Sequence, residues 1–409
     1  MTITSPVIIL GAGISGLALG QGLLKASIPF HIYERDSSLN VRAQGYRVRI
    51  NDSGIDSLKQ LIKPELYARL EDSMAITTTE GAAPPVMLDT ITGQPAKLNY
   101  TGPRPPAGPQ PLNADRSVLR MVLTKGLEDN ITFSKEFSFY TTTSSGIIIH
   151  FTDGTSVTGS LLVGADGTKS KVRSRLLPDH KNIDTEGRWF FGKTTITPSL
   201  LSNLHPTVAS QMTLVQDRTN SIPKSLLLEP VRFKDNQYRS DLPADYIYWV
   251  VGSRKDALDM SDAELLSLTH EDAANQVLAL TSAWDPRIRE LFKHQDIPQT
   301  SFLKIDSAKP DLPVWETDER VTLIGDAVHA MSPAAGVGAV TALRSAEALF
   351  RAITAGVGEN RVSKGSLRAY EDEMRGFAGK AIGHAFFGGK MLFGMRSFEE
   401  LIARENEGK

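Results

Sequence analysis

A glycine-rich turn near the start of the chain constrains its fold most. Residues 6–10 are apolar and predict a buried strand, GAGISG follows directly at 11–16, and the Leu- and Ala-rich residues 17–24 predict a helix. The next apolar run, 30–33, ends in Glu34, about twenty residues after the glycines. Strand, Gly-x-Gly-x-x-Gly turn, helix, strand and acid follow the order of a dinucleotide-binding unit, so chance glycines are the weaker explanation. The sequence predicts an α/β fold with a parallel sheet.

Each position of this turn has an expected task. Gly11 makes the tight turn, Gly13 lets a pyrophosphate approach the backbone, and Gly16 allows the helix to pack on the strand. Glu34 is expected to hold the ribose hydroxyls of an adenosine. We expect Arg35 to lie over the adenine or near a phosphate.

A strand that ends in a carboxylate recurs late in the chain. The apolar run 320–324 leads into GDAVHAMSPAAGVG at 325–338, and an Ala- and Leu-rich helix follows. Asp326 can accept hydrogen bonds from a polyol, and Gly336 and Gly338 allow backbone N–H groups to approach a flat ring. The N-terminus of the helix favours negative charge nearby. This segment therefore predicts a second contact with the bound cofactor.

A third segment, GADGTKSKVR at 164–173, follows a predicted strand and is the most specific of the three. In this order and spacing, the three segments resemble those of the single-component FAD-dependent aromatic hydroxylases over about residues 5–375. That family includes para-hydroxybenzoate hydroxylase, the tetracycline-inactivating monooxygenases and fungal natural-product monooxygenases. The resemblance implies a Rossmann-like FAD-binding domain that is interleaved with an antiparallel-sheet substrate domain and followed by C-terminal helices.

The resemblance also implies a reaction. NADPH or NADH reduces FAD and leaves, O2 forms a flavin C4a-hydroperoxide, and one oxygen atom hydroxylates or epoxidises an aromatic or polyene small molecule. Such chemistry serves natural-product biosynthesis or drug inactivation. A flavin oxidase or dehydrogenase, or a non-redox cyclisation catalyst, on the same fold stays open as an alternative. Two departures from the family pattern, Val340 and Ser345, keep these alternatives open because they fall at the cofactor loop and its helix.

The resemblance assigns cofactor contacts residue by residue. Arg116, which with Leu119 forms the family's Arg-x-x-Leu helix start, is expected to reach the flavin side of the cofactor through its planar guanidinium. The expected FAD-binding set is Gly11, Gly13, Ile14, Ser15, Gly16, Glu34, Arg35, Gly45, Arg116, Asp166, Gly167, Gly325, Asp326, Pro333, Gly336, Val337, Gly338 and Ala339.

Catalytic and substrate residues are less constrained by the sequence. Arg47 and His329 are the catalytic candidates, although the first also fits a solvated strand face and the second a structural pattern of the family. The substrate-binding candidates are Arg49, Phe191, Met212 and Trp249. Strand alternation allows only about half of the strand residues to face a cavity.

The interleaving predicts where the chain crosses between lobes. Residues 1–75, 111–178 and 286–360 are assigned to the FAD-binding domain, 76–110 to a crossing, 179–285 to the substrate domain and 361–409 to C-terminal helices. Within these parts we expect Asp52 or Ser53 to cap a helix, a helix to open at Asn113, a meander over 131–160, and helices over 262–292 that return the chain to the first lobe.

Composition excludes several kinds of function. The 409 residues contain no cysteine, which excludes disulfides, thiolate metal sites and cysteine nucleophiles, and no metal site is expected. A net charge of −2 gives no drive toward nucleic acid or a membrane surface, and no apolar run approaches the roughly 18 residues that span a bilayer. We expect a cytoplasmic enzyme, monomeric or homodimeric, whose partners are its small-molecule substrate and O2.

Overall fold

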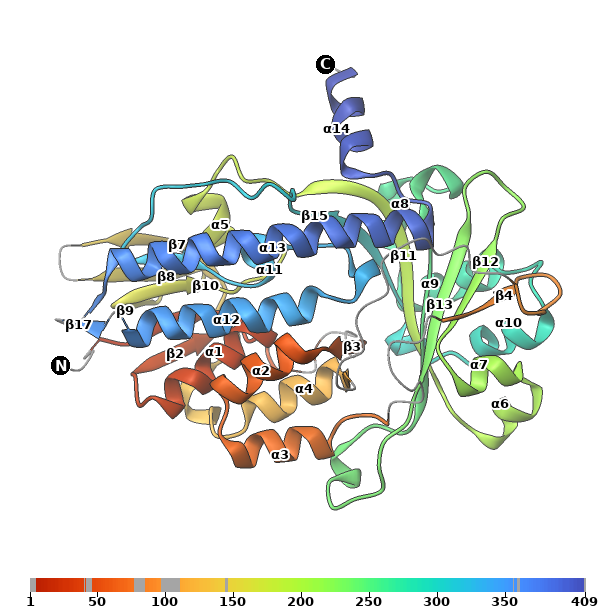
Figure 1. The fold of residues 1–409 in the computed structure, drawn as a ribbon, viewed down its shortest axis with the longest axis horizontal. Helices are drawn as coiled ribbons and strands as arrows, with labels where there is room; N and C mark the ends of the chain where they lie inside the picture. The colour runs from red at the N-terminus through yellow and green to blue at the C-terminus, as the bar shows by residue number, and fades with distance from the viewer. Residues whose placement is uncertain are drawn as a thin grey trace.

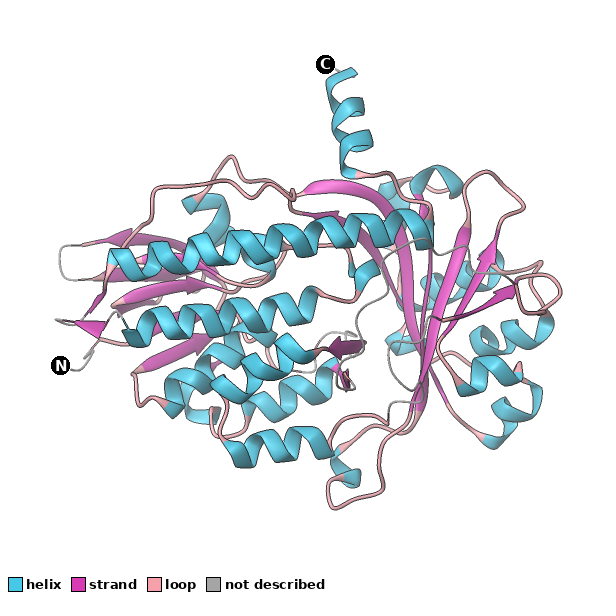
Figure 2. Ribbon diagram, viewed as in Figure 1, coloured by secondary structure: helices cyan, strands magenta, loops and turns pink. Residues whose placement is uncertain are grey.

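The computed structural model describes residues 5–39, 41, 46–76, 85–96, 111–143, 146–355, 357–358 and 361–407. In these ranges the chain forms two lobes side by side, one built on a parallel sheet and one on a large, mostly antiparallel sheet (Figures 1 and 2). The predicted α/β fold with an antiparallel second sheet and C-terminal helices is thereby confirmed. No helix among the described residues is both long and apolar enough to cross a membrane.

The first lobe is organised around a five-stranded parallel sheet, called here sheet A. Its strands lie in the order β16 (Val321–Leu323), β10 (Leu161–Gly164), β1 (Val7–Leu10), β2 (Phe30–Tyr33) and β6 (Ile131–Thr132). β1, β10 and β16 are wholly buried, as expected for parallel strands that are covered on both faces. The strand β6 was expected in the meander, and its parallel pairing with β2 places it in sheet A instead.

Helices cover one face of sheet A, where α1 (Ile14–Lys25) packs on α12 (Gly338–Ala355), and α12 packs on α13 (Lys364–Phe393) (Figure 1). The predicted meander is present as β7 (Phe137–Thr142), β8 (Ile147–Phe151) and β9 (Ser156–Gly159). The remaining elements of this lobe are α2 (Asp52–Leu61), α3 (Pro64–Asp72), α4 (Arg116–Thr124), α5 (Lys171–Leu176), α11 (Asp326–His329) and the hairpin β17 (Val357–Gly358) and β18 (Arg361–Val362).

The second lobe is built on a six-stranded sheet, called here sheet C. Its order is β15 (Ser301–Ser307), β11 (Ile183–Thr195), β14 (Tyr246–Arg254), β13 (Lys224–Val231), β12 (Thr213–Asp217) and β4 (Val86–Asp89). All of its pairings are antiparallel except that of β4 with β12. The helices α6 (Pro198–Asn203), α7 (Pro206–Ser210), α8 (Asp262–Ser267), α9 (His270–Leu280) and α10 (Pro286–Lys293) belong to this lobe.

Alternation along the strands of sheet C separates an outer face from an inner one. On β14, Ile247, Trp249 and Val251 enter a core that also contains side chains of α8, α9 and α10. Tyr248 and Val250, one residue out of phase, pack on the inner face toward the first lobe. The expectation that residues 262–292 return to the first lobe was therefore wrong, because these helices cover the outer face of sheet C. The pairing of β15 with β11 keeps the chain in this lobe as far as Ser307.

The N-termini of two helices, α2 and α4, differ from the sequence prediction. The cap of α2 is Asn51, whose side chain accepts from the Gly54 N–H at 3.4 Å, rather than Asp52 or Ser53. The segment expected to open a helix at Asn113 is the strand β5 (Leu112–Asp115), which pairs with β3 (Arg47–Ile50) as a separate two-stranded ribbon. α4 begins only at Arg116, because Asp115, the last residue of β5, caps the N-terminus of this helix.

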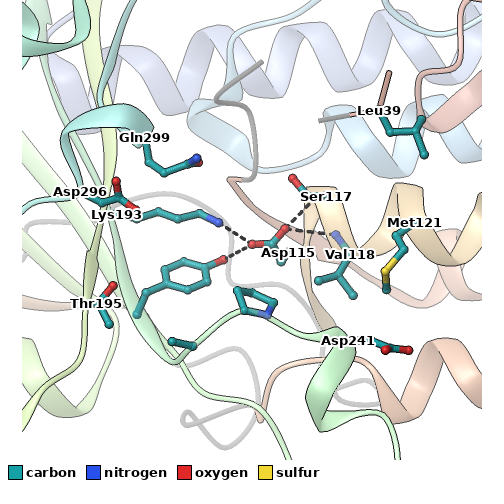
Figure 3. Close-up of a pocket in the computed structure, with 13 residues that line it drawn as sticks. Leu39, Asp115, Ser117, Val118, Met121, Lys193, Thr195, Asp241, Asp296 and Gln299 are labelled. Atoms are coloured by element: carbon teal, nitrogen blue, oxygen red, sulfur yellow. Dashed lines mark hydrogen bonds and ion pairs between the residues drawn. The ribbon is translucent and has the colours of Figure 1, made fainter. Parts of the chain in front are cut away.

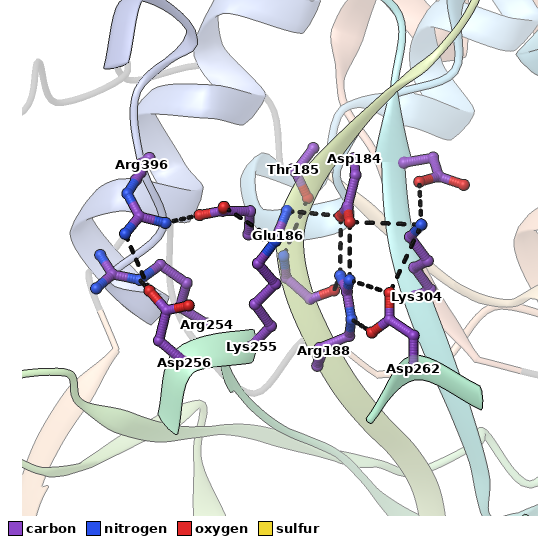
Figure 4. Close-up of polar contacts among 12 residues, drawn as sticks. Asp184, Thr185, Glu186, Arg188, Arg254, Lys255, Asp256, Asp262, Lys304 and Arg396 are labelled. Atoms are coloured by element: carbon purple, nitrogen blue, oxygen red, sulfur yellow. Dashed lines mark hydrogen bonds and ion pairs between the residues drawn. The ribbon is translucent and has the colours of Figure 1, made fainter. Parts of the chain in front are cut away.

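The end of α13 is fastened to sheet C by charged side chains (Figure 4). Arg396, just after this helix, forms ion pairs with Glu186 on β11 and with Asp256. Beside it, the fully buried Arg188 pairs with Asp184 at 2.8 Å and with Asp262 at 2.6 Å. A buried guanidinium requires such full pairing. The ion pairs of Arg396 fix the C-terminal segment against the second lobe. The last helix, α14 (Phe398–Glu407), projects away from the body (Figure 1).

Candidate active site

The residues expected to hold a cofactor gather at one edge of sheet A. The Gly-x-Gly-x-x-Gly turn follows β1, Glu34 follows β2, the second segment follows β10, and the third follows β16. These strands are parallel, so their carboxyl ends meet at the same edge. Ligands of open α/β sheets bind outside the carboxyl ends of the strands.

The glycine turn leaves room for a ligand at one position only. A Cβ on Gly11, whose φ is +113°, would lie 2.3 Å from the Ala165 carbonyl oxygen, and one on Gly16 would lie 2.0 Å from that of Gly11. A Cβ on Gly13 would meet no protein atom within 4 Å. Gly13 is also the N-cap of α1, and no side chain caps that end. The first-turn N–H groups are thus left for an anion, which fits the pyrophosphate of a dinucleotide.

Glu34 lies directly beside this turn. Its Oε2 accepts from the Ala12 N–H at 2.8 Å, and its Oε1 accepts from the Asp36 N–H at 3.0 Å. Arg120 on α4 braces the same turn by donating from Nε to the Ala12 carbonyl at 3.1 Å. Glu34 therefore ties the turn to β2, while its contact with a ribose stays a prediction. Arg35 is exposed at the rim.

The second segment is held by Asp166. This carboxylate accepts from the Ser170 hydroxyl at 2.5 Å and from the N–H groups of Lys171 at 2.9 Å and Val172 at 3.3 Å, so it caps α5. Burial raises the pKa of Asp166, and these hydrogen bonds oppose that effect. Gly167, with φ of +80°, has open space beside it.

Arg173, also in the second segment, links it to the third. This buried guanidinium donates to the carbonyls of Ala327 at 2.9 Å and Thr168 at 3.0 Å. The sequence predicted this arginine on a helix. It did not indicate the hydrogen bonds to the third segment, because their acceptors are backbone carbonyls, which every residue has.

Asp326 and Arg116, expected on the same cofactor, are brought together by the fold. The Asp326 side chain is exposed to solvent and yet is surrounded by enough protein that burial raises its pKa, while the charge of Arg116 lowers it. Gly325, with φ of +62°, precedes it, and a Cβ there would lie 2.4 Å from Ser15 Oγ. Ser15 therefore packs against the third segment, next to the turn.

His329 lies in the core, out of contact with solvent. It is fully buried, its Nε2 is 3.1 Å from the Ser345 hydroxyl, and burial lowers its pKa to about 4. Ser345 donates to the Ala342 carbonyl at 3.0 Å and accepts from the Gly325 N–H at 3.2 Å. A buried, neutral imidazole has no path for exchanging protons with a substrate, which argues against the catalytic assignment of His329. It holds the third segment in place instead.

The turn after His329 faces the second lobe. Pro333 begins a short 3-10 turn that ends at Gly336, whose φ is +65°, and α12 begins at Gly338. Val337, Gly338 and Ala339 are half-exposed at the N-terminus of α12, where N–H groups are directed outward. Ala334 packs with inner-face side chains of sheet C, so the two lobes meet at this turn.

The four substrate candidates differ in their position relative to the inner face of sheet C. Phe191 lies on it, with its ring 4.9 Å from that of Tyr46. Trp249 lies on the outer face, where its Nε1 donates to the Thr194 hydroxyl at 3.1 Å, so its assignment to a substrate was wrong. Met212 is half-exposed just before β12, and Arg49 is half-buried on β3. Gly45, expected beside the flavin, lies outside the described residues.

Arg47, the other catalytic candidate, is ion-paired with Glu229 on β13, and both side chains are almost wholly buried. Sequence reasoning missed Glu229 and Tyr46, and it did not select Tyr248, which lies on a predicted strand, as a substrate candidate. Only the pairing of β3 with β5, and of β13 with β14, brings these residues together. Pairing between segments so far apart leaves no signal in one sequence.

A pocket of about 420 Å³ opens between α4 and sheet C (Figure 3). Asp115 lies at its centre, where it accepts from Lys193 Nζ at 2.6 Å and from the Tyr246 hydroxyl at 2.8 Å. Its other oxygen accepts from the N–H groups of Ser117 and Val118 and so caps α4. One carboxylate thus joins the N-terminus of α4 to the second lobe.

Comparisons with known proteins agree with this geometry. Residues 4–385 match the family model of the FAD binding domain. The chain is 38% identical to the dual O-methyltransferase/FAD-dependent monooxygenase elcB of Phaeosphaeria nodorum over 98% of this chain and 47% of that protein. It is 31% identical to the FAD-dependent monooxygenase dbaB of Emericella nidulans over 80% of this chain and 81% of that protein.

Solved structures agree as well. A crystal structure assigned as an FAD-containing monooxygenase, from Photorhabdus luminescens, superimposes with a TM-score of 0.77 and 27% identity over 95% of this chain and 99% of that one. The chain spans about half the length of curated relatives such as elcB. With its glycine turn, its acid after β2 and its third segment in place, the chain belongs to the FAD-binding-domain family that includes fungal FAD-dependent monooxygenases.

Proposed function

We propose that the chain is an FAD-dependent monooxygenase that uses NAD(P)H and O2 to hydroxylate or epoxidise an aromatic or polyene small molecule. The observation that carries this proposal is the group of cofactor-binding candidates at the carboxyl edge of sheet A. There Gly13 leaves room for a pyrophosphate, and Asp326 lies accessible but enclosed beside Arg116. Bound FAD would accept two electrons from the nicotinamide and reduce O2, with one oxygen atom passing to the substrate and the other to water.

The residues at this edge of sheet A and on the facing side of sheet C would supply binding and shielding. Arg116 and the first-turn N–H groups of α1 and α12 offer positive charge to an anionic cofactor. The inner face of sheet C, with Phe191, Tyr46 and Ala334 in contact across the lobes, offers an apolar wall for a flat ring. Such a wall excludes water, which a reaction with activated oxygen requires.

The relatives support a role in secondary metabolism. Fungal proteins named as FAD-dependent monooxygenases match at 38% and 31% identity. One of them is named as a dual O-methyltransferase/FAD-dependent monooxygenase, so we propose an oxygenated aromatic compound as the substrate. The choice between NADPH and NADH is part of the test.

The test follows the visible absorbance of the FAD-loaded protein without oxygen. Phenols, naphthols and polyenes are each added with and without NADPH or NADH, and ¹⁸O2 is then admitted. We expect fast bleaching only when a compound and a nicotinamide are both present, and one ¹⁸O atom in the product. Bleaching by a compound alone would identify an oxidase or dehydrogenase. A flavin that nicotinamide never reduces would contradict the proposal altogether.

A further inference from the structure

Four charged side chains form a closed group between the β3–β5 ribbon and sheet C. Arg47 and Asp115 are opposite each other in the ribbon, so their side chains leave it on the same face. Arg47 pairs with Glu229, and Asp115 pairs with Lys193 at 2.6 Å. We call Arg47, Asp115, Lys193 and Glu229 the charge clamp.

Tyr248 lies in the middle of this clamp. On sheet C it is opposite Lys193 of β11 on one side and Glu229 of β13 on the other, so the three side chains form one row on the inner face. Its ring contacts that of Tyr46 at 6.2 Å, and both belong to the apolar cluster that includes Ala334 of the third segment. The phenol is therefore held where the two lobes meet.

The hydroxyl of Tyr248 has no hydrogen-bond partner among the described residues, whereas the hydroxyls of two neighbouring tyrosines each have one. The hydroxyl of Tyr246 donates to Asp115, and that of Tyr46 bonds with Ser301. Tyr248 is half-exposed, so its hydroxyl can be reached from the space between the lobes.

The surroundings keep this phenol neutral. Burial raises the pKa of Tyr248, and the nearby Tyr46 and Glu229 raise it further, while Arg47 lowers it. A neutral phenol both donates and accepts, so it suits a hydroxyl or a carbonyl oxygen equally. The cations beside it, Lys193 and Arg47, are each paired with a carboxylate of the clamp.

We propose that Tyr248 contacts the substrate, and that its hydroxyl hydrogen-bonds a phenol or quinone oxygen on an aromatic ring. The clamp positions Tyr248 and does not itself bind the ligand. This inference rests on the proposed function for the existence of an aromatic substrate. It adds that the ring carries a hydroxyl or carbonyl oxygen at the position that meets Tyr248.

The test measures binding and requires no turnover. The FAD-loaded wild type and Tyr248→Phe are titrated with 1-naphthol and 1-methylnaphthalene, and changes in the flavin absorbance give dissociation constants. Loss of one neutral hydrogen bond predicts about 3- to 10-fold weaker binding of 1-naphthol, with 1-methylnaphthalene unchanged. Tyr140→Phe, on the distant strand β7, is the matched control and should change none of the constants.

Each outcome decides the inference separately from the proposed function. Equal losses for 1-naphthol and 1-methylnaphthalene would show that Tyr248 only fills space, and no loss would show that it does not contact the ligand. No spectral change with any probe would also overturn the inference. None of these results affects the reduction of FAD by nicotinamide, which tests the proposed function. The hydroxyl has no partner to lose, so Tyr248→Phe should unfold within about 2 °C of the wild type.

Discussion

The hydroxyl of Ser345 lies 3.1 Å from Nε2 of His329 and accepts from the Gly325 N–H at 3.2 Å. Ser345 donates its own proton to the Ala342 carbonyl, so His329 must be the donor in their bond, which places its proton on Nε2. A departure from the family pattern thus serves to fasten the strand end to the helix α12. The other departure, Val340, is buried against Gly54 of α2, where it fills the contact between two helices.

Replacing Ser345 by alanine should weaken both folding and FAD binding. The change leaves the His329 N–H and the Gly325 N–H without their acceptor, which predicts a loss of about 1–3 kcal/mol in the free energy of unfolding. Thermal unfolding of the apoprotein and titration with FAD measure the two effects. Ser57→Ala is a suitable control, because that buried helical hydroxyl donates only to the Ser53 carbonyl of its own helix. Equal effects of the two changes would contradict the role given to Ser345.

Stability should fall as the pH is lowered, with His329 as one cause. Its pKa is about 4 in the folded protein and about 6.5 when unfolded, so the unfolded state binds the proton more readily. The contribution is fully present above the unfolded pKa and is lost as the pH falls from 6.5 toward 4, up to about 3 kcal/mol. His329→Gln, which retains a donor near Nε2, should unfold with a weaker dependence on pH over this range. An unchanged dependence would show that other groups control acid unfolding.

Replacing one partner of the Arg47–Glu229 ion pair should lower the free energy of unfolding more than replacing both partners. Both side chains are nearly inaccessible, so Arg47→Met leaves a buried carboxylate and should cost about 3–5 kcal/mol in unfolding free energy. The double variant Arg47→Met/Glu229→Leu should recover most of that loss, since no unpaired charge remains. Denaturant unfolding of the wild type, Arg47→Met, Glu229→Leu and the double variant gives the coupling energy. Additive losses would mean that the two residues do not stabilise each other.

The glycine turn should separate ligand binding from folding. A Cβ on Gly13 meets no protein atom within 4 Å, whereas one on Gly16 lies 2.0 Å from the Gly11 carbonyl oxygen. Gly13→Ala should therefore leave the unfolding midpoint of the apoprotein nearly unchanged while it weakens FAD binding, because the methyl group occupies the space of the pyrophosphate. Gly16→Ala should destabilise the apoprotein itself. FAD binding that Gly13→Ala leaves unchanged would show that the cofactor does not approach this turn.

The parts of the fold that the sequence predicted are those specified locally. The turn at 11–16, Glu34 and the third segment carry glycines and carboxylates at strand ends, where spacing along the chain defines position. The resemblance implied the antiparallel sheet of the second lobe, but the sequence did not show which face of each strand lines the site. Trp249 and Tyr248 are neighbours in sequence and lie on opposite faces, so the choice between them depends on which side the helices α8–α10 cover.

The ribbon illustrates why the rest of the site could not be predicted. Asn113 to Asp115 precede a helix and look like its first turn, but their backbone pairs with β3, more than sixty residues earlier. Asp115 caps the helix as a local pattern would allow, and it also binds Lys193 and Tyr246 of the other lobe. Contacts of the second kind depend on how the lobes dock, which no local pattern contains.

Asp115 therefore limits how the lobes can move. Its Oδ1 accepts a hydrogen bond from the N-terminus of α4 in the first lobe, and its Oδ2 accepts from Lys193 and Tyr246 in the second. Drawing the lobes apart at this point would strip the carboxylate of its cation, whereas rotation about it would preserve every bond. Any opening that admits a substrate should consequently pivot at Asp115 and be widest far from it.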